Sequence, residues 1–189
     1  MSKKNTIAQI GEPILRKKTL KVEPNKIQSL KVKNIIKELI ETMKMHNGAG
    51  LAANQIYYNL RICVIEIDNN RRYKHLPKIP LKILINPKIK ILDKCNTFDS
   101  YEGCLSVPNL RGKVKRFCKI RVEYYNEKAE FKSEIFNDYT SVVFQHEIDH
   151  LDGILFTDRV TDNKSIVTYT NYIKFYEKKY IQDIKKNFD

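Results

Sequence analysis

The string His146-Glu147-Ile148-Asp149-His150 constrains the fold of this chain more than any other part of its sequence. On a helix, residues four apart lie one above the other, so both imidazoles can bind one metal ion. Glu147 is offset around the helix but stays close enough to contact a water at that metal. A chance match to this pattern is expected about 0.005 times in a chain of this composition. The alternative is a pair of histidines on a solvated helix face.

The residues around this string predict a buried helix over 138–151. Tyr139, Val142 and Val143 extend the face of the two histidines as an apolar stripe. Residues 137–138 can cap the start of the helix, and Gly153 stands just past its end. The histidines are therefore expected to face the interior of the protein, and the remaining elements must pack around them.

A third protein ligand is needed, because a catalytic site of this kind uses three ligands and leaves one position for water. The extended zinc-protease pattern would place a histidine at position 156, but this residue is Phe and no histidine follows His150. Cys104 is the better candidate. It lies in the string YEGCLSVP over 101–108, where Gly103 permits unusual backbone angles and Pro108 fixes the exit.

The other cysteines do not suggest a metal or a disulfide framework. The four cysteines form no Cys-x-x-Cys pair and no dense pattern. Cys63 and Cys118 fall within strand patterns and are expected to be small core residues, and Cys95 lies by a polar turn. A reduced compartment fits this usage, and there Cys104 can serve as a thiolate ligand.

A third string, Gly48-Ala49-Gly50-Leu51-Ala52-Ala53-Asn54-Gln55, combines small residues with one amide. Small residues let another backbone or a substrate approach closely, and the amide of Gln55 can donate to an oxyanion. A glycine-containing connection between a helix and a strand explains the string equally well. It lacks the Gly-Lys-Ser/Thr ending of a phosphate-binding loop, so no nucleotide cofactor is expected.

Two further helices are predicted, one near each end of the chain. Over 27–46, apolar residues recur at steps of three and four, which predicts an amphipathic helix that stops at Gly48. A last helix is expected over 164–187. Both are expected to flank the part of the chain that carries the strand patterns.

Between these helices the pattern changes to that of β-strands. Alternation of apolar and polar residues marks half-buried strands, and β-rich runs end at turn-forming residues. We expect strands over 60–68, 83–87, 88–92, 118–124 and 129–135, with the second and third either separated or bulged at Pro87. The last two are expected to form an antiparallel hairpin. This order indicates a single α+β domain over 1–189, with short, mainly antiparallel sheets around the central metal-binding helix.

Neither a membrane span nor an export signal is predicted. No stretch approaches the roughly 20 continuous apolar residues that a span needs. The first ten residues contain no apolar segment of the kind that signal peptides carry. A bacterial cytoplasmic protein with no membrane partner is the simplest interpretation, and an organellar enzyme that has lost its presequence is the alternative.

The charge of the chain is strongly basic. It carries 35 Lys and Arg against 22 Asp and Glu, a formal net charge of +13. Such a surface attracts polyanions such as RNA, DNA or acidic membrane. The alternative is a bias in coding composition, since abundant Lys, Ile and Asn arise in AT-rich coding without selection for anion binding.

Taken together and in this order, the three strings resemble the peptide deformylase family, whose members remove the formyl group from new N-formylmethionyl chains. The strings that carry the resemblance are GAGLAANQ (48–55), EGCLS (102–106) and QHEIDHLDG (145–153). The segment 11–16 is also similar to the family's N-terminal segment. Asn54 departs from the pattern, because the family usually has proline before the glutamine.

The resemblance implies a metal held by Cys104, His146 and His150, with water in the fourth position. The family typically uses Fe(II), and zinc, nickel or cobalt can occupy the site. A Cys/His/His set suits several of these metals, so the sequence selects none of them. By the same resemblance, Glu147 takes the water's proton and delivers it to the departing amine. Gln55 and the backbone N–H of Leu105 share the charge of the tetrahedral intermediate with the metal.

The substrate-binding residues are expected on both sides of the metal. Tyr139, Val142 and Val143 precede His146 by seven, four and three positions, which favours an apolar pocket for the methionine side chain; ordinary core packing is the alternative. By resemblance, Arg111 matches the family arginine that contacts the peptide, and Gly50 matches a backbone contact to substrate. Glu102 is expected to orient the site loop through a buried pair with Arg116.

The expected partners are N-formylmethionyl nascent peptides, and ribosomal RNA contacted through the basic surface, especially the C-terminal helix. Two other functions stay open. One is a different metallohydrolase, such as a peptidase or a deformylase-like protein that acts on another N-acylated amine. The other is a basic RNA- or ribosome-binding protein whose metal is structural, a role in which Glu147 would have no use.

Overall fold

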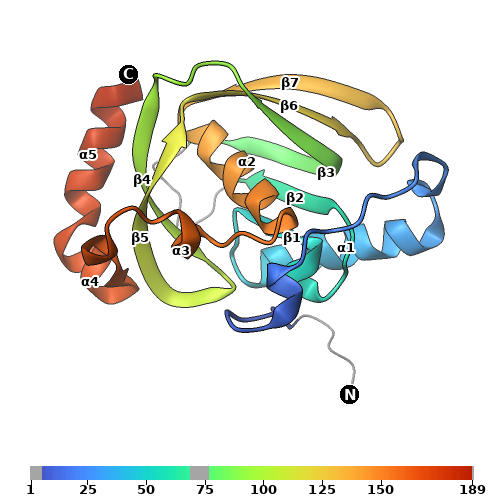
Figure 1. Ribbon diagram of the computed structural model, residues 1–189, viewed down its shortest axis with the longest axis horizontal. Helices are drawn as coiled ribbons and strands as arrows, with labels where there is room; N and C mark the ends of the chain where they lie inside the picture. Colours follow the sequence, from blue (N-terminus) through green and yellow to red (C-terminus); the bar gives the residue numbers. More distant parts are fainter. Residues whose placement is uncertain (1–5, 69–76, 189) are drawn as a thin grey trace.

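Two antiparallel sheets and the flanking helices surround helix α2 (Asp138–Leu151) in the computed structural model, which describes residues 6–68 and 77–188 (Figure 1). The α+β class with antiparallel sheets around the HExxH helix is confirmed. The bounds of α2 coincide with the predicted range, and Gly153 follows it with a positive φ of 77°. Asn137 stands at the N-cap position, but its side chain makes no capping hydrogen bond.

The larger sheet has the strand order β1-β2-β3-β6-β7. Its strands are β1 (Gly50–Ala52), β2 (Ile62–Ile67), β3 (Ile79–Ile91), β6 (Lys119–Tyr125) and β7 (Phe131–Asn137). The predicted β6–β7 hairpin is confirmed. The runs over 83–87 and 88–92 belong to one strand, β3, and the alternative of a bulge at Pro87 is the one found. The register with β6 shifts between Ile85 and Lys88, where Asn86 has a φ of 55°.

The second sheet was not anticipated from the sequence. It has the order β4-β5-β8, with β4 (Thr97–Cys104), β5 (Val107–Phe117) and β8 (Val167–Thr168). The β4–β5 hairpin ends with Cys104 paired to Val107, so the thiol stands at the tip of a long hairpin, just past a shift in register between Glu102 and Cys104. Gly103 has no positive φ, which makes the expectation of unusual backbone angles there wrong. Gly103 is needed instead because it has no side chain, so that the guanidinium of Arg111 can pack against its main chain.

Helix α1 (Leu30–Met45) covers one face of the larger sheet and is shorter than predicted. It begins after Ser29, whose hydroxyl accepts from the N–H of Val32. The predicted stop at Gly48 is wrong by one residue, because Asn47 takes the left-handed conformation at φ 52°. The N–H of Gly48 then donates to the carbonyl of Met43, the pattern of a Schellman cap.

The C-terminal segment is not the single helix predicted over 164–187. It contains a 3-10 turn (Asn163–Ser165), strand β8, helix α4 (Tyr169–Phe175) and helix α5 (Glu177–Phe188). The pairing of β8 with β5 at Leu110 and Arg111 interrupts the helix, and Thr168 caps the start of α4. Both helices lie against the β4–β5 hairpin (Figure 1). The short elements η1 (Pro13–Arg16), η2 (Pro24–Lys26), η3 (Ala53–Ile56) and α3 (Phe156–Arg159) complete the described structure.

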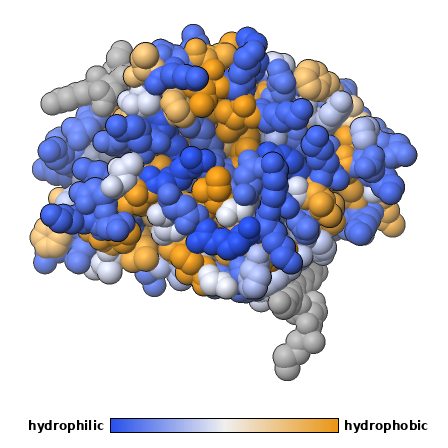
Figure 2. All heavy atoms as spheres, in the orientation of Figure 1, coloured by the Kyte–Doolittle hydropathy of each residue, from blue (hydrophilic) through white to orange (hydrophobic). Residues whose placement is uncertain are grey.

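Apolar side chains fill the space between α2, the sheets and α1. Cys63 and Cys118 belong to this core, as predicted, and Cys95 is exposed; all are free thiols. Hydrophilic residues cover most of the face seen in Figure 2, with apolar groups between them. Within residues 6–68 and 77–188, no helix combines the length and hydropathy that a bilayer-spanning helix requires.

Candidate metal centre

Cys104, His146 and His150 converge on one point at the centre of the molecule. Their ligand atoms all lie within 4.8 Å of one another, and Cys104 Sγ is 3.1 Å from His150 Nε2. The two histidines come from successive turns of α2, and the thiol comes from the end of β4. One thiolate and two imidazoles on a common point suit a divalent transition metal.

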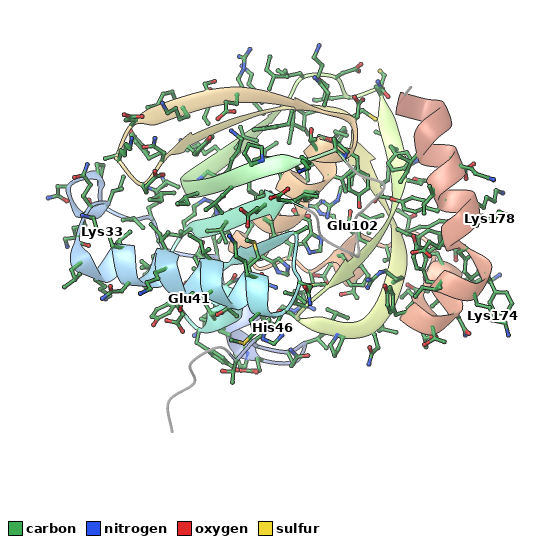
Figure 3. All side chains as sticks on the ribbon, turned by 180° about the vertical axis from the view of Figure 1, so that it is seen from behind. Lys33, Glu41, His46, Glu102, Lys174 and Lys178 are labelled. Carbon is green, nitrogen blue, oxygen red and sulfur yellow. The ribbon has the colours of Figure 1, made fainter. Side chains whose placement is uncertain are left out.

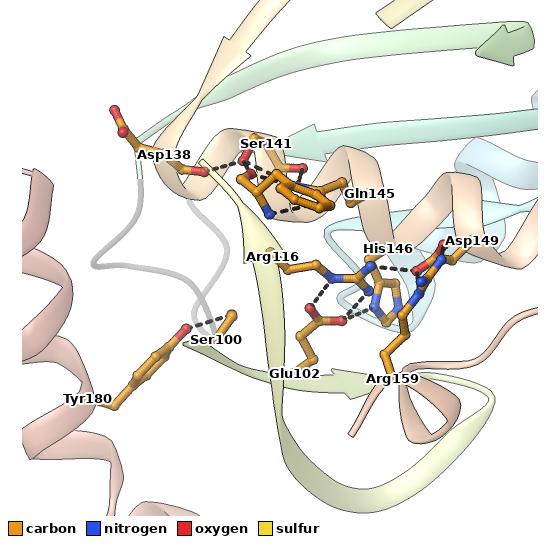
Figure 4. Close-up of polar contacts among 11 residues, drawn as sticks. Ser100, Glu102, Arg116, Asp138, Ser141, Gln145, His146, Asp149, Arg159 and Tyr180 are labelled. Atoms are coloured by element: carbon orange, nitrogen blue, oxygen red, sulfur yellow. Dashed lines mark hydrogen bonds and ion pairs between the residues drawn. The ribbon is translucent and has the colours of Figure 1, made fainter. Parts of the chain in front are cut away.

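Glu102 fixes the orientation of the first histidine. Its carboxylate accepts from His146 Nδ1 at 2.8 Å (Figure 4). The other ring nitrogen is therefore the one that faces the thiol of Cys104. The expected Glu102–Arg116 pair is present, with distances of 2.6 and 2.9 Å from the guanidinium to the two carboxylate oxygens. Burial opposes ionisation of Glu102, but Arg116 and His146 outweigh it and lower its pKa to about 2.

The ion pair extends into a network that the sequence did not reveal. Arg116 also donates to Asp149 at 2.5 Å, and Arg159 from α3 donates to the same carboxylate at 2.6 and 3.0 Å. Figure 4 shows the chain of side chains from Glu102 through Arg116 and Asp149 to Arg159. Asp149 lies inside the HExxH string, and the network therefore ties the metal-binding helix to β4, β5 and α3.

The thiol of Cys104 is held in the form that binds metals, whereas His146 must lose a proton before it can do so. Burial disfavours the charged thiolate, but the imidazoles of His150 and His146 outweigh it and hold the pKa of Cys104 well below its usual value. Burial also opposes protonation of His146, while Cys104 and Glu102 raise its pKa well above the usual range. A thiolate is the ligand form of cysteine, and loss of the imidazole proton accompanies metal binding.

Glu147 is buried beside the three ligands with one oxygen unsatisfied. Its side chain is 5% exposed, and among the described residues Oε2 has no hydrogen-bond partner. Burial is the largest influence on this carboxyl and raises its pKa to about 7. Burying a carboxylate oxygen without a hydrogen-bond partner costs free energy of folding, so such a group calls for a functional explanation. A proton acceptor poised near neutrality in a pocket is what general-base chemistry requires.

Gly50 makes room for this carboxylate, and its replacement by alanine is expected to impair the site. A Cβ at Gly50 would lie 2.5 Å from Glu147 Oε1, much closer than van der Waals contact. Gly50→Ala should therefore shift the carboxylate and lower kcat about 10- to 100-fold, with metal content retained. Gly48→Ala is a milder comparison in the same loop, because a Cβ there would meet the side chain of Leu105 at 3.0 Å and the carbonyl oxygen of Gly50 at 3.1 Å, but would not reach Glu147. Equal kcat values for the two variants would contradict the assigned role of the Gly50 position.

Gln55 stands directly beside the thiol. Its amide nitrogen donates to Ser106 Oγ at 3.0 Å and lies 3.5 Å from Cys104 Sγ, while its oxygen accepts from the N–H of Ala52 at 2.8 Å. Ser106 belongs to the EGCLS string, but no role was predicted for it. Its hydroxyl holds the amide of Gln55 in place. The N–H of Ser106 also points at Cys104 Sγ, at 3.3 Å.

Asn54, the departure from the family pattern, joins the glutamine segment to the metal-binding helix. It is fully buried, and its amide nitrogen donates to the carbonyl of His150 at 2.5 Å. A proline at this position would have no side-chain donor. A proline would restrict the backbone at this position, whereas the asparagine fixes the segment by a hydrogen bond to the main chain of the ligand residue His150.

The remaining predicted site residues lie around one pocket that opens from the metal centre. Its lining includes Gly50, Leu105, Arg111, Tyr139, Val142 and Val143, together with Cys104, His146 and Glu147. Sequence reasoning missed Tyr101, which also lines the pocket and precedes the EGCLS string directly. His150 lies behind this surface and is 1% exposed. All the residues expected on sequence grounds are thus within one site.

A Cys/His/His centre on an HExxH helix, with a buried carboxylate beside it, defines the class of metal-dependent hydrolases. The comparisons with known proteins identify the family. The family model described as Polypeptide deformylase matches residues 4–165. The chain belongs to this family, and it is a metallohydrolase.

Relatives and solved structures agree with this assignment. Peptide deformylase 2 of Nostoc sp. is 38% identical over 166 residues, which are 88% of this chain and 91% of that protein. Peptide deformylase of Leptospira biflexa is 40% identical over 84% of this chain and 88% of its own length. The Met-Ala-Ser-bound class I type b enzyme of Acinetobacter baumannii has a TM-score of 0.76 at 34% identity, covering 82% of this chain and 96% of that one. The Thermotoga maritima peptide deformylase has a TM-score of 0.72 at 35% identity, covering 82% and 97%.

Proposed function

We propose that this protein removes the N-formyl group from the N-terminal methionine of newly synthesised proteins and releases formate. It would do so through one catalytic domain that spans residues 1–189. The observation that carries the proposal is the buried carboxylate of Glu147, whose Oε2 has no hydrogen-bond partner in the described part of the chain, next to the convergent Cys104, His146 and His150. A site that only stabilised the fold would not keep such a carboxylate facing a pocket.

Cys104, His146 and His150 are the residues that would hold a divalent ion, and their donor set fits one. We propose Fe(II) as the native metal, with zinc, nickel and cobalt as alternatives that the same ligands accept. Such an ion acts as a Lewis acid and lowers the pKa of water.

The chain's own residues perform the proton transfers and stabilise the charge that develops. Glu147 accepts the proton of the attacking water and delivers it to the departing amine. The side-chain amide of Gln55 and the main-chain N–H of Leu105 donate to the formyl oxygen as it becomes negative. The bonds of Gln55 to Ala52 and Ser106 support this role, because they hold the amide beside the thiol before substrate arrives.

The rest of the pocket would hold the formylmethionyl peptide. Val142, Val143 and Tyr139 supply apolar surface for the methionine side chain, and they lie on the same helix as the histidines. The main chain at Gly50 and the guanidinium of Arg111 would bind the peptide backbone. A formylated chain would therefore extend from the metal centre along the β4–β5 hairpin.

The direct test is an anaerobic assay of the iron-loaded protein with formyl-Met-Ala-Ser. We expect release of formate and Met-Ala-Ser, the peptide bound in the Acinetobacter relative. Acetyl-Met-Ala-Ser and unformylated peptides serve as comparison substrates, and they should be turned over far more slowly. Cleavage of unformylated peptides would favour a peptidase, and bound metal without any hydrolysis would favour a structural metal in an RNA-binding protein.

We also propose that the protein docks on ribosomal RNA, where such substrates emerge, in the cytoplasm of a bacterium. Lys174, Lys178 and Lys179 are exposed on the C-terminal helices, and Figure 3 shows Lys174 and Lys178 pointing away from the fold. Co-sedimentation with ribosomes should be strongest at low salt. Replacing the three lysines with alanine should weaken it and reduce the salt slope by up to about 3, without a change in kcat. No co-sedimentation at low salt would contradict the docking.

A further inference from the structure

The C-terminal segment that follows the family match packs against the candidate site. The match ends at residue 165, whereas β8 and α4 occupy 167–175. Strand β8 pairs with β5 at Arg111 itself, because Arg111 lies opposite Val167 in the register. The next residues of the segment therefore reach the position where Arg111 projects into the pocket.

The side chain of Arg111 is held in a defined place. It is 8% exposed, and its guanidinium lies directly over Gly103, where any Cβ would overlap it. One of its nitrogens donates to the carbonyl of Leu110 at 2.8 Å. The guanidinium also lies over the ring of Tyr169, which comes from the first turn of α4. The distance from the guanidinium carbon to the ring centroid is 4.5 Å. The negative face of an aromatic ring attracts a cation in this position, so the contact holds the guanidinium in place.

Helix α4 is itself fixed against the pocket wall. Tyr169 stacks on Tyr172, and Tyr172 contacts Tyr101, whose ring centroid is 5.2 Å away. From α5, Tyr180 contacts Tyr101 at 5.6 Å and shares a hydrogen bond of 2.8 Å with Ser100 (Figure 4). Since Tyr101 lines the pocket, the C-terminal helices are anchored to the site rather than to a remote surface.

We propose that Tyr169 is a positioning residue that holds Arg111 ready to bind the main-chain carbonyl of the residue after formylmethionine. This inference rests on the proposed function. The guanidinium lies against Gly103, the neighbour of Cys104, and Arg111 lines the same pocket as Cys104, His146 and Glu147. A long arginine side chain loses rotamer freedom when it binds, so a ring that holds it in advance reduces this cost.

Two substitutions separate the ring from the hydroxyl of Tyr169. Tyr169→Leu removes the ring and should raise KM for formyl-Met-Ala-Ser roughly 3- to 30-fold, with kcat within about twofold. Tyr169→Phe keeps the ring and should restore KM to within about twofold of wild type. With N-formylmethionine amide, which has no following residue, Tyr169→Leu should leave kcat/KM unchanged. A residue that only stabilised the fold would affect both substrates alike.

Two further comparisons make the test specific. Phe175→Leu removes an aromatic ring from the same helix; Phe175 is 62% exposed and contacts Lys174 and Tyr176, so KM should not change. In an Arg111→Ala background, Tyr169→Leu should add nothing, because Tyr169 acts through Arg111. An equal effect of Phe175→Leu, or an undiminished effect in the Arg111→Ala background, would overturn the proposal.

Binding of the product peptide gives a readout that does not depend on turnover. The Kd of Met-Ala-Ser, measured by calorimetry, should rise by a similar factor in Tyr169→Leu and stay unchanged in Phe175→Leu. If the wild-type protein releases no formate, the proposed function fails, yet this comparison still decides the role of Tyr169. An unchanged Kd in Tyr169→Leu would refute it.

Discussion

Replacing Glu147 with Gln should lower kcat about 10²- to 10⁴-fold, because the amide keeps the shape of the side chain but cannot accept the proton of water. The substitution also removes a buried carboxylate whose Oε2 has no hydrogen-bond partner among the described residues, so the fold should not be weakened. Metal content should stay at the wild-type level, since the three ligands are untouched. The measurements are kcat with formyl-Met-Ala-Ser, metal content and thermal unfolding. Glu147→Ala should give the same loss of activity.

A matched control replaces a carboxylate elsewhere with the same amide. Glu41 lies on α1 in an exposed pair with Lys37, and Glu41→Gln should leave kcat unchanged. Wild-type turnover in Glu147→Gln would remove Glu147 from the proton transfers. Loss of metal together with activity would instead make Glu147 a contributor to the metal site.

The site could be predicted from the sequence because its central residues carry local patterns. The spacing of the two histidines requires only a helix, and the helix over 138–151 forms as the apolar stripe predicted. The thiol and the glutamine lie in strings that resemble those of a known family, and Arg111 is matched by its position after one of these strings. These residues converge in one pocket because of the fold, and this convergence could not be predicted from the local pattern of any one string.

The β4–β5 hairpin escaped prediction because its buried positions do not alternate as apolar residues. Along β5 the buried side is occupied by Gly112, Val114 and Arg116. A glycine and a charged residue at these positions hide the period of two on which strand prediction depends. The arginine is inside because it serves the ion pairs with Glu102 and Asp149, so the feature that concealed the strand is part of the site.

The C-terminal helix was predicted too long for a related reason. Strand β8 is only two residues long, and it forms because Leu110 and Arg111 offer it a strand edge. A pairing between residues far apart in sequence leaves no trace in the local periodicity. Tyr169 therefore could not be connected with Arg111 until the fold placed them together.

The Arg116→Met variant should lose about 3–5 kcal/mol of unfolding free energy, the second large effect that the structure predicts. Arg116 is 3% exposed and is paired with two carboxylates that are themselves buried. Methionine fills a similar volume but leaves Glu102 and Asp149 without their shared cation. Urea unfolding at neutral pH measures the loss.

Arg16→Met provides the matched control, because Arg16 pairs with Asp158 at the surface, where both side chains are more than a third exposed. Its loss should be within about 1 kcal/mol. The double variant Arg116→Met/Glu102→Gln should recover part of the stability, since it removes the Glu102 charge that has lost its arginine, while Asp149 keeps its pair with Arg159. Equal losses for Arg116→Met and Arg16→Met would show that the buried network does not stabilise the fold.

The same network links stability to metal binding, which gives the Arg116 variant a second expected effect. Arg116 keeps Glu102 ionised, and the ionised carboxylate accepts from His146 Nδ1. Without the arginine, the pKa of Glu102 loses the largest influence that lowers it, and the ionised carboxylate that orients the ring is less favoured, so metal affinity should fall about 10- to 100-fold. Competition with a chelator measures this fall. The double variant, although more stable, should not recover metal affinity, because a neutral amide cannot replace the carboxylate beside His146.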